Sequence, residues 1–499
     1  MEMFHLLPYA LFFLVSLLTL KLFFGSRKYK NLPPGPSPLP IIGNLNLLEL
    51  PLHRFLQRLT EKHGKVFSLW MGSRLAVVVS SHAAFQECFT KNDVALANRP
   101  RNLSGKHIFY NYTTVGSCSY GEHWRNLRRI TSLEVLSTQR IHSFTGIRKD
   151  ETYRMIRTLA KDSCMDYAPV ELSSLFHDMS YNNMMRMLAG KRYYGNETEM
   201  KDVKEAKEFR ETVEELLHLI GVSNKAEHLP FLRWFDFQNV VKRLKNISKR
   251  FDTLLDGFVL EQRSKKQREN TMIDHLLTLQ ESQPDYYTDQ IIKGLVLAML
   301  IGGTDSSAVT IEWAISNLLN HPEVLKKARD ELDTHIGQDR LISESDLSKL
   351  PYLKKIILET LRLHPPAPIS IPHVNSEDIT IGEFNIPRDT MVLVNIWAIQ
   401  RDPQLWNKAL SFIPERFDVE GEEKKLVAFG MGRRACPGEP LAMQNVGLTL
   451  GTLIQCFEWK RVTEEEIDMT EANWFSLSRV TPLNALCKAR PLVSKINLK

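Results

Sequence analysis

Hydrophobic residues recur at helical spacing over most of the chain, and short apolar runs replace this spacing at only a few places. Two such runs, residues 66–70 and 75–80, are separated by a short turn at 71–74 and predict a hairpin. Three more runs predict short strands at residues 379–381, 384–386 and 391–394. The pattern therefore predicts a mainly α fold with small β-sheets, in the α+β class.

The longest helical pattern runs from about residue 288 to residue 319 and stops at Asn320-His321-Pro322. Its middle, residues 295–301, is apolar on every side, which predicts a buried helix. The next six residues, 302–307, are two glycines and four polar residues. Because glycine weakens a helix and buried polar groups need partners, this interruption indicates a functional site. A kink stabilised by serine-to-backbone hydrogen bonds is the alternative interpretation.

Residues 4–24 are almost wholly apolar and are long enough for one membrane-spanning helix, since a bilayer core needs about 20 residues. Arg27, Lys28 and Lys30 follow at once, which predicts that the rest of the chain stays in the cytosol. A cleaved signal peptide is the alternative, but the apolar run is longer than is usual for one and no small-residue cleavage motif follows. We expect residues 1–26 to form a single-pass anchor.

The prolines of residues 33–40 fix backbone φ angles and favour an extended, semi-rigid spacer. Such a run is also typical of ligands for adaptor domains, but this one lies directly between a predicted membrane span and globular sequence. We expect residues 27–40 to form a basic, proline-rich hinge. No second linker, repeat or charge block appears in residues 41–499, so we expect a single domain there.

With 43% hydrophobic and 24% charged residues, the 499-residue chain has an ordinary globular composition, which excludes a disordered or collagen-like protein. Its net charge of +6, from 64 basic and 58 acidic residues, is spread along the sequence. A diffuse charge fits a membrane surface or an acidic protein better than nucleic acid, so we expect no nucleic-acid binding. The six cysteines form no C-x-x-C pair and suggest neither a zinc knuckle nor a disulfide framework.

A lone cysteine is usually a small core residue, but the neighbours of Cys436 indicate a metal ligand. Gly430 and Gly432 permit positive φ angles, so the backbone can fold around the sulfur and turn amides toward it. Pro437 and Glu439 suit the first turn of a helix, whose positive end favours a thiolate.

Gly438 allows a flat ligand to approach the backbone, and Arg434 offers a guanidinium group that can pair with a carboxylate. A thiolate held by amides beside a cation is what an iron porphyrin with a cysteine axial ligand requires. Residues 429–438, FGMGRRACPG, resemble F-x-x-G-x-R-x-C-x-G, the haem-binding signature of the cytochromes P450, and the resemblance extends over essentially the whole chain. It implies the cytochrome P450 fold with one N-terminal transmembrane helix, a haem-thiolate monooxygenase domain, haem b as cofactor and Cys436 as the axial ligand of the haem iron.

Two further motifs resemble those of the family. Trp124 and Arg128 match W-x-x-x-R, which implies hydrogen bonds from both to a haem propionate; an amphipathic helix with one buried aromatic residue is the alternative. His373 stands where many relatives place an arginine against a propionate, which leaves its charge state open. The motif E-x-x-R implies a buried structural triad, for which a solvated surface ion pair is the alternative. The residues of this triad are Glu359, Arg362 and Arg416.

Residues 302–307 resemble the family's oxygen-binding groove, A/G-G-x-D/E-T-T/S. The resemblance implies that Asp305 and Ser306 are the catalytic acid and alcohol that deliver protons for dioxygen activation. Serine in place of the usual threonine keeps the hydroxyl group but loses the β-branched restraint on χ1. Coupling of oxygen consumption to product is therefore less assured, although we expect activity.

Mostly apolar and aromatic residues are expected to line the substrate pocket, which suits a flat apolar molecule; each could equally be ordinary core. They are Phe109, Val115, Val296, Gly302, Ile369 and Phe475. Over the whole sequence, including runs such as 120–129 and 191–195, the chain resembles plant isoflavone hydroxylases, which add a hydroxyl group to the B ring at the 2′ or 3′ position. A monooxygenase acting on another flavonoid, a lignan or a terpenoid is the alternative.

The resemblance implies dioxygen and electrons from NADPH through NADPH-cytochrome P450 reductase, at the endoplasmic reticulum membrane. A positive face for that acidic partner is expected from six residues, although charge runs are more often merely solvated. They are Arg125, Arg128, Arg129, Lys424, Lys425 and Arg433. Two remote alternatives are a P450-fold isomerase or dehydratase, which needs neither dioxygen nor reductase, and a non-enzymatic haem sensor. Retention of both Asp305 and Ser306 disfavours them.

Overall fold

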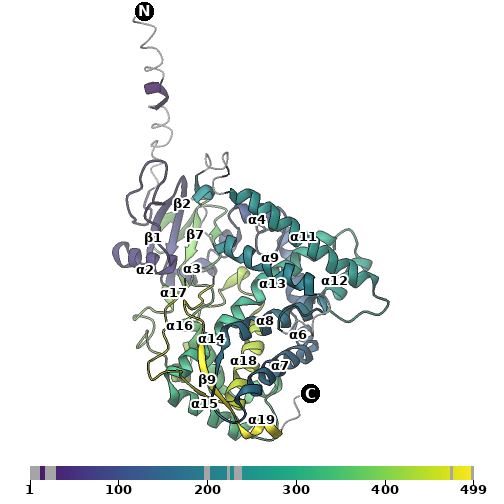
Figure 1. Cartoon of the computed structure of the whole chain (residues 1–499). Coiled ribbons are helices and arrows are strands. Elements are labelled where there is room, and N and C mark those ends of the chain that lie inside the picture. Colours follow the sequence, from purple (N-terminus) through teal and green to yellow (C-terminus); the bar gives the residue numbers. More distant parts are fainter. Residues whose placement is uncertain are drawn as a thin grey trace, which may run out of the picture.

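The computed structural model describes residues 12–16, 30–195, 203–221, 225–229, 236, 239–472 and 476–495 (Figure 1). The expected anchor at residues 1–26 lies outside the described residues except for residues 12–16, which are helical, and hinge residues 27–29 lie outside them too. Within the described part, one helical stretch is long and apolar enough to cross a membrane, Asp289–Asn320. Since 67% of its most apolar window is buried in the protein, this stretch is a core helix.

Helices make up most of the described chain, as the hydrophobic spacing predicts. They are α2 (Leu52–His63), α3 (His82–Phe89), α4 (Leu103–His107), α5 (Glu122–Ile130), α6 (Thr138–Ser143), α7 (Thr145–Ser163), α8 (Leu172–Ala189), α9 (Val203–Gly221), α10 (Lys225–His228), α11 (Val240–Ser264), α12 (Met272–Ser282), α13 (Asp289–Gly303), α14 (Asp305–Asn320), α15 (Pro322–His335), α16 (Pro351–Leu363), α17 (Ile396–Ile399), α18 (Glu439–Cys456) and α19 (Pro491–Lys495).

Short strands in the described residues form three small sheets, so the prediction of a mainly α fold with small sheets is confirmed. The strands are β1 (Val66–Met71), β2 (Arg74–Val79), β3 (Ala168–Glu171), β4 (His373–Val374), β5 (Ile379–Ile381), β6 (Phe384–Ile386), β7 (Met391–Val394), β8 (Phe457–Lys460) and β9 (Asn484–Ala489). The sheets have the orders β1-β2-β7-β4, β3-β9-β8 and β5-β6. Only β2 and β7 pair in parallel.

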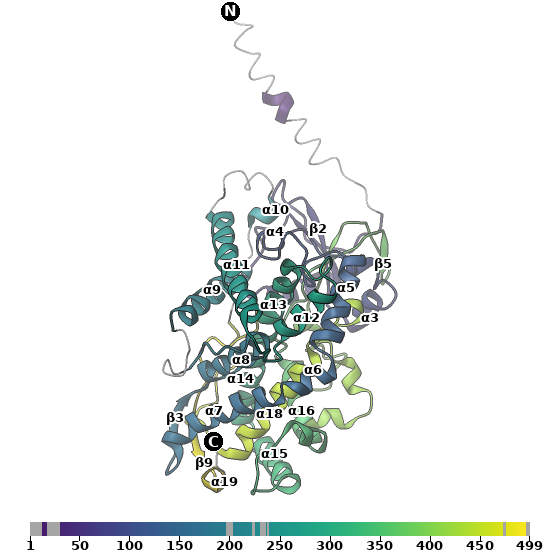
Figure 2. The same cartoon turned by 90° about the vertical axis from the view of Figure 1, so that its right-hand side faces the viewer.

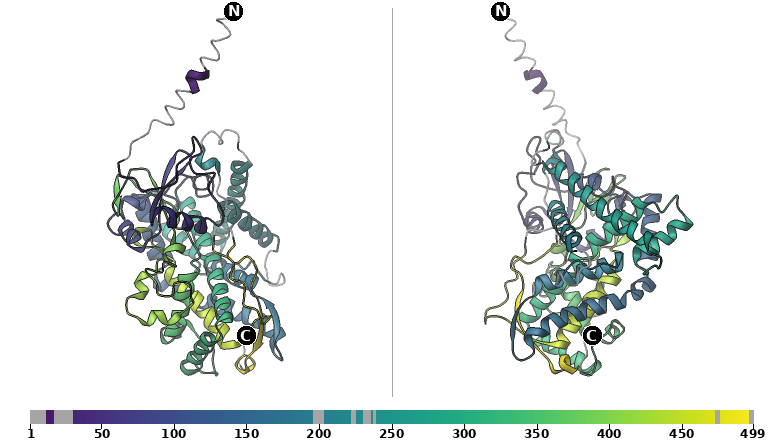
Figure 3. Two further views of the ribbon diagram at one scale, coloured as in Figure 1. Left: turned by 90° about the vertical axis from the view of Figure 1, so that its left-hand side faces the viewer. Right: turned by 45° about the vertical axis from the view of Figure 1, so that its right-hand side comes forward.

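The N-terminal hairpin and the strands of residues 379–394 gather at one end of the molecule, beside α2 (Figure 3). The predicted hairpin is confirmed as β1 and β2, and the three predicted strands are confirmed as β5, β6 and β7. The hydrophobic pattern did not predict β3, β4, β8 or β9. Of these strands, β3 pairs with β9 from the other end of the chain.

The long central helix is broken at Thr304 into α13 and α14 (Figure 2). Thr304 Oγ1 donates to the carbonyl of Leu300 and Ser306 Oγ to that of Gly302, at 2.8 and 2.9 Å. The helix is therefore interrupted, as predicted, and the back-bonding of the alternative interpretation is present as well. α13 packs in one hydrophobic cluster with α11, whereas α14 packs in a second with α7, α16 and α18. The break lies where these two cores meet.

Glu359 and Arg362 of α16 form a buried ion pair, so the alternative of a surface pair is wrong. Arg362 Nε and Nη2 lie 2.7 and 2.8 Å from the two Glu359 carboxylate oxygens, and neither side chain is exposed. Arg416 joins them, with Nε 2.9 Å from both oxygens. The other N–H groups of Arg362 donate to the carbonyls of residues 400, 409 and 411. This network attaches α16 to the segment that leads to the cysteine loop.

A second buried carboxylate, that of Glu471, joins α2 to the C-terminal part of the chain. It accepts hydrogen bonds from His53 Nε2 at 2.9 Å, Arg54 Nε at 2.8 Å and Trp397 Nε1 at 2.7 Å, and Arg401 Nη2 lies 3.3 Å away. Burial by itself raises the pKa of Glu471, but the hydrogen bond from His53 and the charge of Arg401 outweigh burial and lower the pKa to about 2. The folded protein therefore favours the carboxylate form.

We predict that Glu471→Gln lowers the free energy of unfolding by about 3 kcal/mol, because it leaves buried cations without their partner. Because the pKa of Glu471 falls from 4.5 to about 2 on folding, its contribution in the parent protein is present above pH 4.5 and is lost as the pH falls toward 2. Urea unfolding between pH 3 and pH 7 tests both expectations. The exposed Glu464→Gln is the control, and equal stability of the two variants would contradict the prediction.

Candidate functional site

The cysteine loop, residues 429–438, ends where α18 begins at Glu439. Gly430 and Gly432 have φ angles of +72° and +71°, the left-handed conformation that their positions suggest. A Cβ atom at Gly432 would lie 2.3 Å from Asp93 Oδ1, so no other side chain fits there without movement. The loop therefore places its cysteine at the N-terminal end of a long helix, as predicted.

Cys436 is exposed, although much of the surrounding chain packs near its sulfur. Its amide donates to the carbonyl of Phe429 at 2.8 Å. Burial raises the pKa of the Cys436 thiol, while the amides of Gly438 and Glu439 and the charge of Arg128 oppose this shift. A cation that replaces the thiol proton would meet amides already oriented toward the sulfur.

The Arg434 guanidinium group, near the middle of the loop, is bound by backbone carbonyls. It donates to Ala97 at 2.8 and 2.6 Å, to Val115 at 2.9 Å and to Cys118 at 2.6 Å. Its central carbon lies 4.5 Å from the ring centroid of Trp124. The structure thus brings together Arg434, Trp124 and the loop that carries Val115.

Two more guanidinium groups, those of Arg99 and Arg128, lie close to this loop. Arg99 donates to the carbonyls of Ile371 and Pro372 at 2.8 and 2.9 Å, whereas Arg128 interacts with the cysteine only through its charge. Among the described residues, no carboxylate pairs with either of them or with Arg434. Burial is the main cause that lowers the pKa of Arg99 to about 9 and of Arg434 to about 10. Positive charge without a partner favours an anionic ligand.

The surroundings of His373 favour its uncharged form. Its Nδ1 donates to the carbonyl of Leu96 at 2.8 Å. Burial, followed by the charge of Arg99, lowers the pKa of His373 well below its ordinary value. Trp124 Nε1 is also occupied, since it donates to the carbonyl of Val115 at 3.2 Å.

The break between α13 and α14 lies next to the cysteine loop. Ser306 and Phe429 line the same cavity of about 30 Å³, together with Met443 of α18. This volume suffices for about one water molecule. Asp305 turns toward α8 instead, where its Oδ1 lies 3.0 Å from His177 Nε2. The two predicted catalytic side chains therefore leave the helix in different directions.

The predicted substrate residues separate into two groups. Phe109, Val115 and Val296 pack in one hydrophobic cluster, which also contains most of α13. Ile369 packs in a different cluster, against the four-stranded sheet. Gly302 is exposed within its otherwise buried helix, and a Cβ atom there would meet nothing within 4 Å. Phe475 lies outside the described residues.

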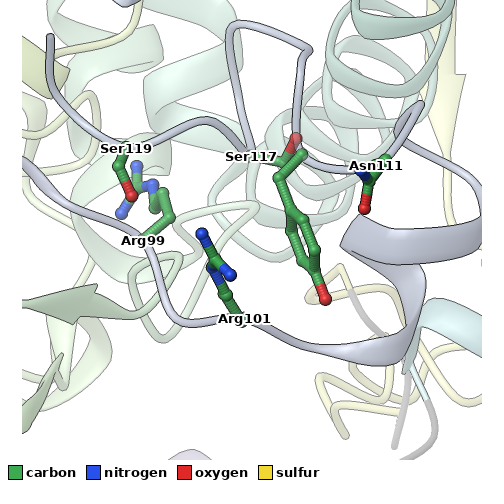
Figure 4. Close-up of a pocket in the computed structure, with 6 residues that line it drawn as sticks. Arg99, Arg101, Asn111, Ser117 and Ser119 are labelled. Carbon is green, nitrogen blue, oxygen red and sulfur yellow. The ribbon is translucent and has the colours of Figure 1, made fainter.

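Arg99 and His177 are residues of this region that sequence reasoning missed. Neither belongs to a motif, and their contacts reach residues more than a hundred positions away. Arg99 also lines a polar cavity of about 200 Å³, shown in Figure 4. The other lining residues are Arg101, Asn111, Tyr112, Ser117 and Ser119. The only sequence signal was the pair of arginines at 99 and 101.

The family model for cytochrome P450 matches residues 33–487. The chain belongs to the cytochrome P450 family. Isoflavone 2′-hydroxylase of Glycyrrhiza echinata is 61% identical to this P450, over 99% of both chains. Isoflavone 3′-hydroxylase of Medicago truncatula is 56% identical, over 98% of this chain and 99% of its own. A zebrafish cytochrome P450 solved with progesterone has a TM-score of 0.75 at 24% identity, covering 89% of this chain and 100% of its own, and supports the fold alone.

This P450 is accordingly a monooxygenase with haem b as cofactor, a reductase that supplies electrons from NADPH and a small-molecule substrate. The described residues fit the cofactor. Cys436 is exposed, and guanidinium groups without carboxylate partners suit the two propionates of haem b. A Cβ atom at Gly438 would make only an ordinary contact with the cysteine sulfur, at 3.7 Å.

We predict that Arg434→Gln reduces haem retention about 10-fold, because it removes the charge and the hydrogen bonds that order the cysteine loop. The rate of haem transfer to apomyoglobin measures retention. Arg433→Gln is the matched control: its side chain is partly exposed and its Nε lies 3.3 Å from Asp93, away from the sulfur. Equal retention by the two variants would contradict the prediction.

Proposed function

We propose that this P450 hydroxylates the B ring of an isoflavone, at the 2′ or the 3′ carbon. The observation that supports the proposal is its high identity, over nearly the whole chain, to plant enzymes named for these two reactions. The apolar cluster of Phe109, Val115 and Val296 supports it as well, because a flat aromatic substrate needs such walls.

We assign the cofactor contacts from the geometry around the cysteine loop. Cys436 would hold the haem iron through its thiolate, and Gly438 adds no side chain beside the sulfur. The proposed partners of the propionates are Trp124, Arg128, His373 and Arg434. Trp124 Nε1 and the Arg434 N–H groups would then exchange backbone carbonyls for propionate oxygens. Bound haem b supplies the activation of dioxygen that monooxygenation requires.

Asp305 and Ser306 are the proposed proton-handling residues of this site. The Ser306 hydroxyl donates to the carbonyl of Gly302 and retains its lone pairs as acceptors for a water molecule in the adjoining cavity. The pKa of Asp305 is lowered, because its bonds to His177 and Ser476 outweigh the effect of burial. Asp305 is therefore ionised at neutral pH, so it must gain a proton before it can pass one on.

We propose that residues 1–26 anchor the protein as a single pass in the endoplasmic reticulum membrane, with residues 27–40 as hinge and 41–499 as the cytosolic catalytic domain. NADPH-cytochrome P450 reductase is the proposed electron donor. Arg125 of α5 and Arg433 of the cysteine loop both lie near the Tyr120 ring, with their guanidinium carbons 5.7 and 5.4 Å from its centroid. This basic surface suits an acidic partner near the haem.

We predict that microsomes containing the full chain convert an isoflavone into a product heavier by one oxygen atom, only with NADPH and dioxygen. Mass spectrometry detects the product, and NMR identifies the 2′ or 3′ position. Cys436→Ser, which lacks the thiolate ligand, is the control and should give no product and no red-shifted Soret band with carbon monoxide. Turnover of flavones, lignans or terpenoids but not isoflavones would contradict the proposal. Conversion of a substrate without NADPH would instead indicate an isomerase.

We predict that combined Lys424→Glu and Lys425→Glu slows reductase-supported turnover about 10-fold at low salt, since electrostatic steering acts on association. Lys424 is exposed, whereas Lys425 approaches Glu422. The haem spectrum should stay unchanged, and turnover driven by a peroxide in place of the reductase should match that of the parent. Unchanged reductase-supported turnover at every ionic strength would contradict this role. The control, Lys326→Glu, removes an exposed charge on α15.

A further inference from the structure

Residues of α8 contact Gly303, Thr304 and Asp305 at the break between α13 and α14. His177 bonds to Asp305, Tyr181 bonds to Thr304, and a Cβ atom at Gly303 would clash with Met184. The three α8 residues recur at the spacing of one helix face. One face of α8 therefore covers the break, and His177 is the member of that face that meets the predicted catalytic carboxylate.

The hydrogen bonds of His177 require a doubly protonated ring. Nδ1 lies 2.7 Å from the carbonyl of Ser173, which only accepts, and Nε2 lies 3.0 Å from the Asp305 carboxylate, which only accepts when ionised. Both ring nitrogens must therefore carry hydrogen. The second oxygen of Asp305 accepts the hydroxyl of Ser476, so the carboxylate is held at both ends.

The surrounding charges favour this imidazolium. Besides Asp305, the charge of Glu312 on α14 raises the pKa of His177. His177 in turn interacts with the charge of the neighbouring Asp178. Arg479 carries the opposite charge next to Glu312, and Arg210 does so next to Asp178. Burial by itself lowers the pKa of His177, but the hydrogen bond and charge of Asp305 outweigh burial and raise the pKa to about 9. The ion pair thus stabilises the fold fully below pH 6.5, and this contribution is lost as the pH rises through about 9.

The pair is also connected to solvent. The His177 side chain is 31% exposed and that of Asp305 is 18% exposed. Ser306, the residue next to Asp305, lines the cavity shared with the cysteine loop. His177 therefore stands at the solvent side of the helix break and Asp305 between it and the interior.

We propose that His177 is the positioning residue for Asp305 and its source of protons from solvent. The Nε2–H bond breaks as a proton passes transiently, and uphill in pKa, to Asp305 Oδ1, which leaves a short-lived neutral imidazole and carboxylic acid. Asp305 passes a proton on toward the Ser306 side of the break, and water returns one proton to Nε2. No electrons move in this relay, and its net result is the transfer of one proton from solvent inward.

The test compares His177→Gln, which hydrogen-bonds without carrying charge, with His177→Lys, which keeps a positive charge at all working pH values. The first readout is the amount of product per NADPH consumed between pH 6.5 and 9.5. The parent value should fall as the pH passes about 9. In His177→Gln, the amount of product per NADPH should be about 10-fold lower than in the parent and should not change with pH. In His177→Lys, it should recover most of the parent value and should not fall near pH 9.

The second readout needs no turnover. In the ferric enzyme labelled with carbon-13 at histidine Cε1, one resonance absent from His177→Gln should titrate near pH 9, and Asp305→Asn should shift that titration downward. His142→Gln, which changes an exposed histidine on α6, is the control and should match the parent in product yield.

A His177→Gln profile identical to that of the parent, or a His177 resonance that titrates below pH 7, would overturn the proposal. It rests on the proposed function only for the choice of isoflavone as substrate. If the parent turns over no isoflavone, the proposed function fails while the histidine titration still decides whether His177 is charged beside Asp305.

Discussion

The guanidinium group of Arg434 joins three distant parts of the chain around the cysteine. Its N–H groups need the carbonyls of Ala97, Val115 and Cys118, and its flat face needs the Trp124 ring. A buried cation without a carboxylate is costly unless dipoles replace its water. These dipoles are available only when the connection after α3, the loop before α5 and the cysteine loop are packed together. The geometry around the sulfur thus depends on one charge that the protein alone does not neutralise.

The need of buried polar groups for hydrogen-bond partners also explains how a polar break persists between two hydrophobic cores. The hydroxyl groups of Thr304 and Ser306 each have an acceptor one turn back along the helix, and the carboxylate of Asp305 has partners on both oxygens. Gly303 adds no side chain, so α8 approaches closely through Met184. These polar groups are therefore hydrogen-bonded within the protein, and Gly302 leaves one side of the helix without a side chain.

The parts of this structure that sequence reasoning predicted are those with local signals. Residues 379–394 alternate and turn as strands do, and the glycines around Cys436 indicate their positive φ angles directly. Motifs located Glu359 and its two arginines, but only the fold shows that they are buried. His177 and the Glu471 network have no local signal, and Arg99 has only its neighbour Arg101, because the roles of all three depend on contacts between residues far apart in the sequence. The neutrality of His373 likewise depends on neighbours that its own segment does not contain. Strands β3 and β9 are short and pair across most of the chain, which no periodicity reveals.

The parallel pairing of β2 with β7 carries a consequence for biosynthesis. Val79 finds its neighbour at Val394, so the N-terminal hairpin presents an open edge until most of the polypeptide has left the ribosome. At about 5–20 residues per second, that interval lasts tens of seconds. An unpaired edge is a template for association with other chains. The nascent protein therefore needs a chaperone, or the nearby membrane surface, to shield this hairpin before its last strand arrives.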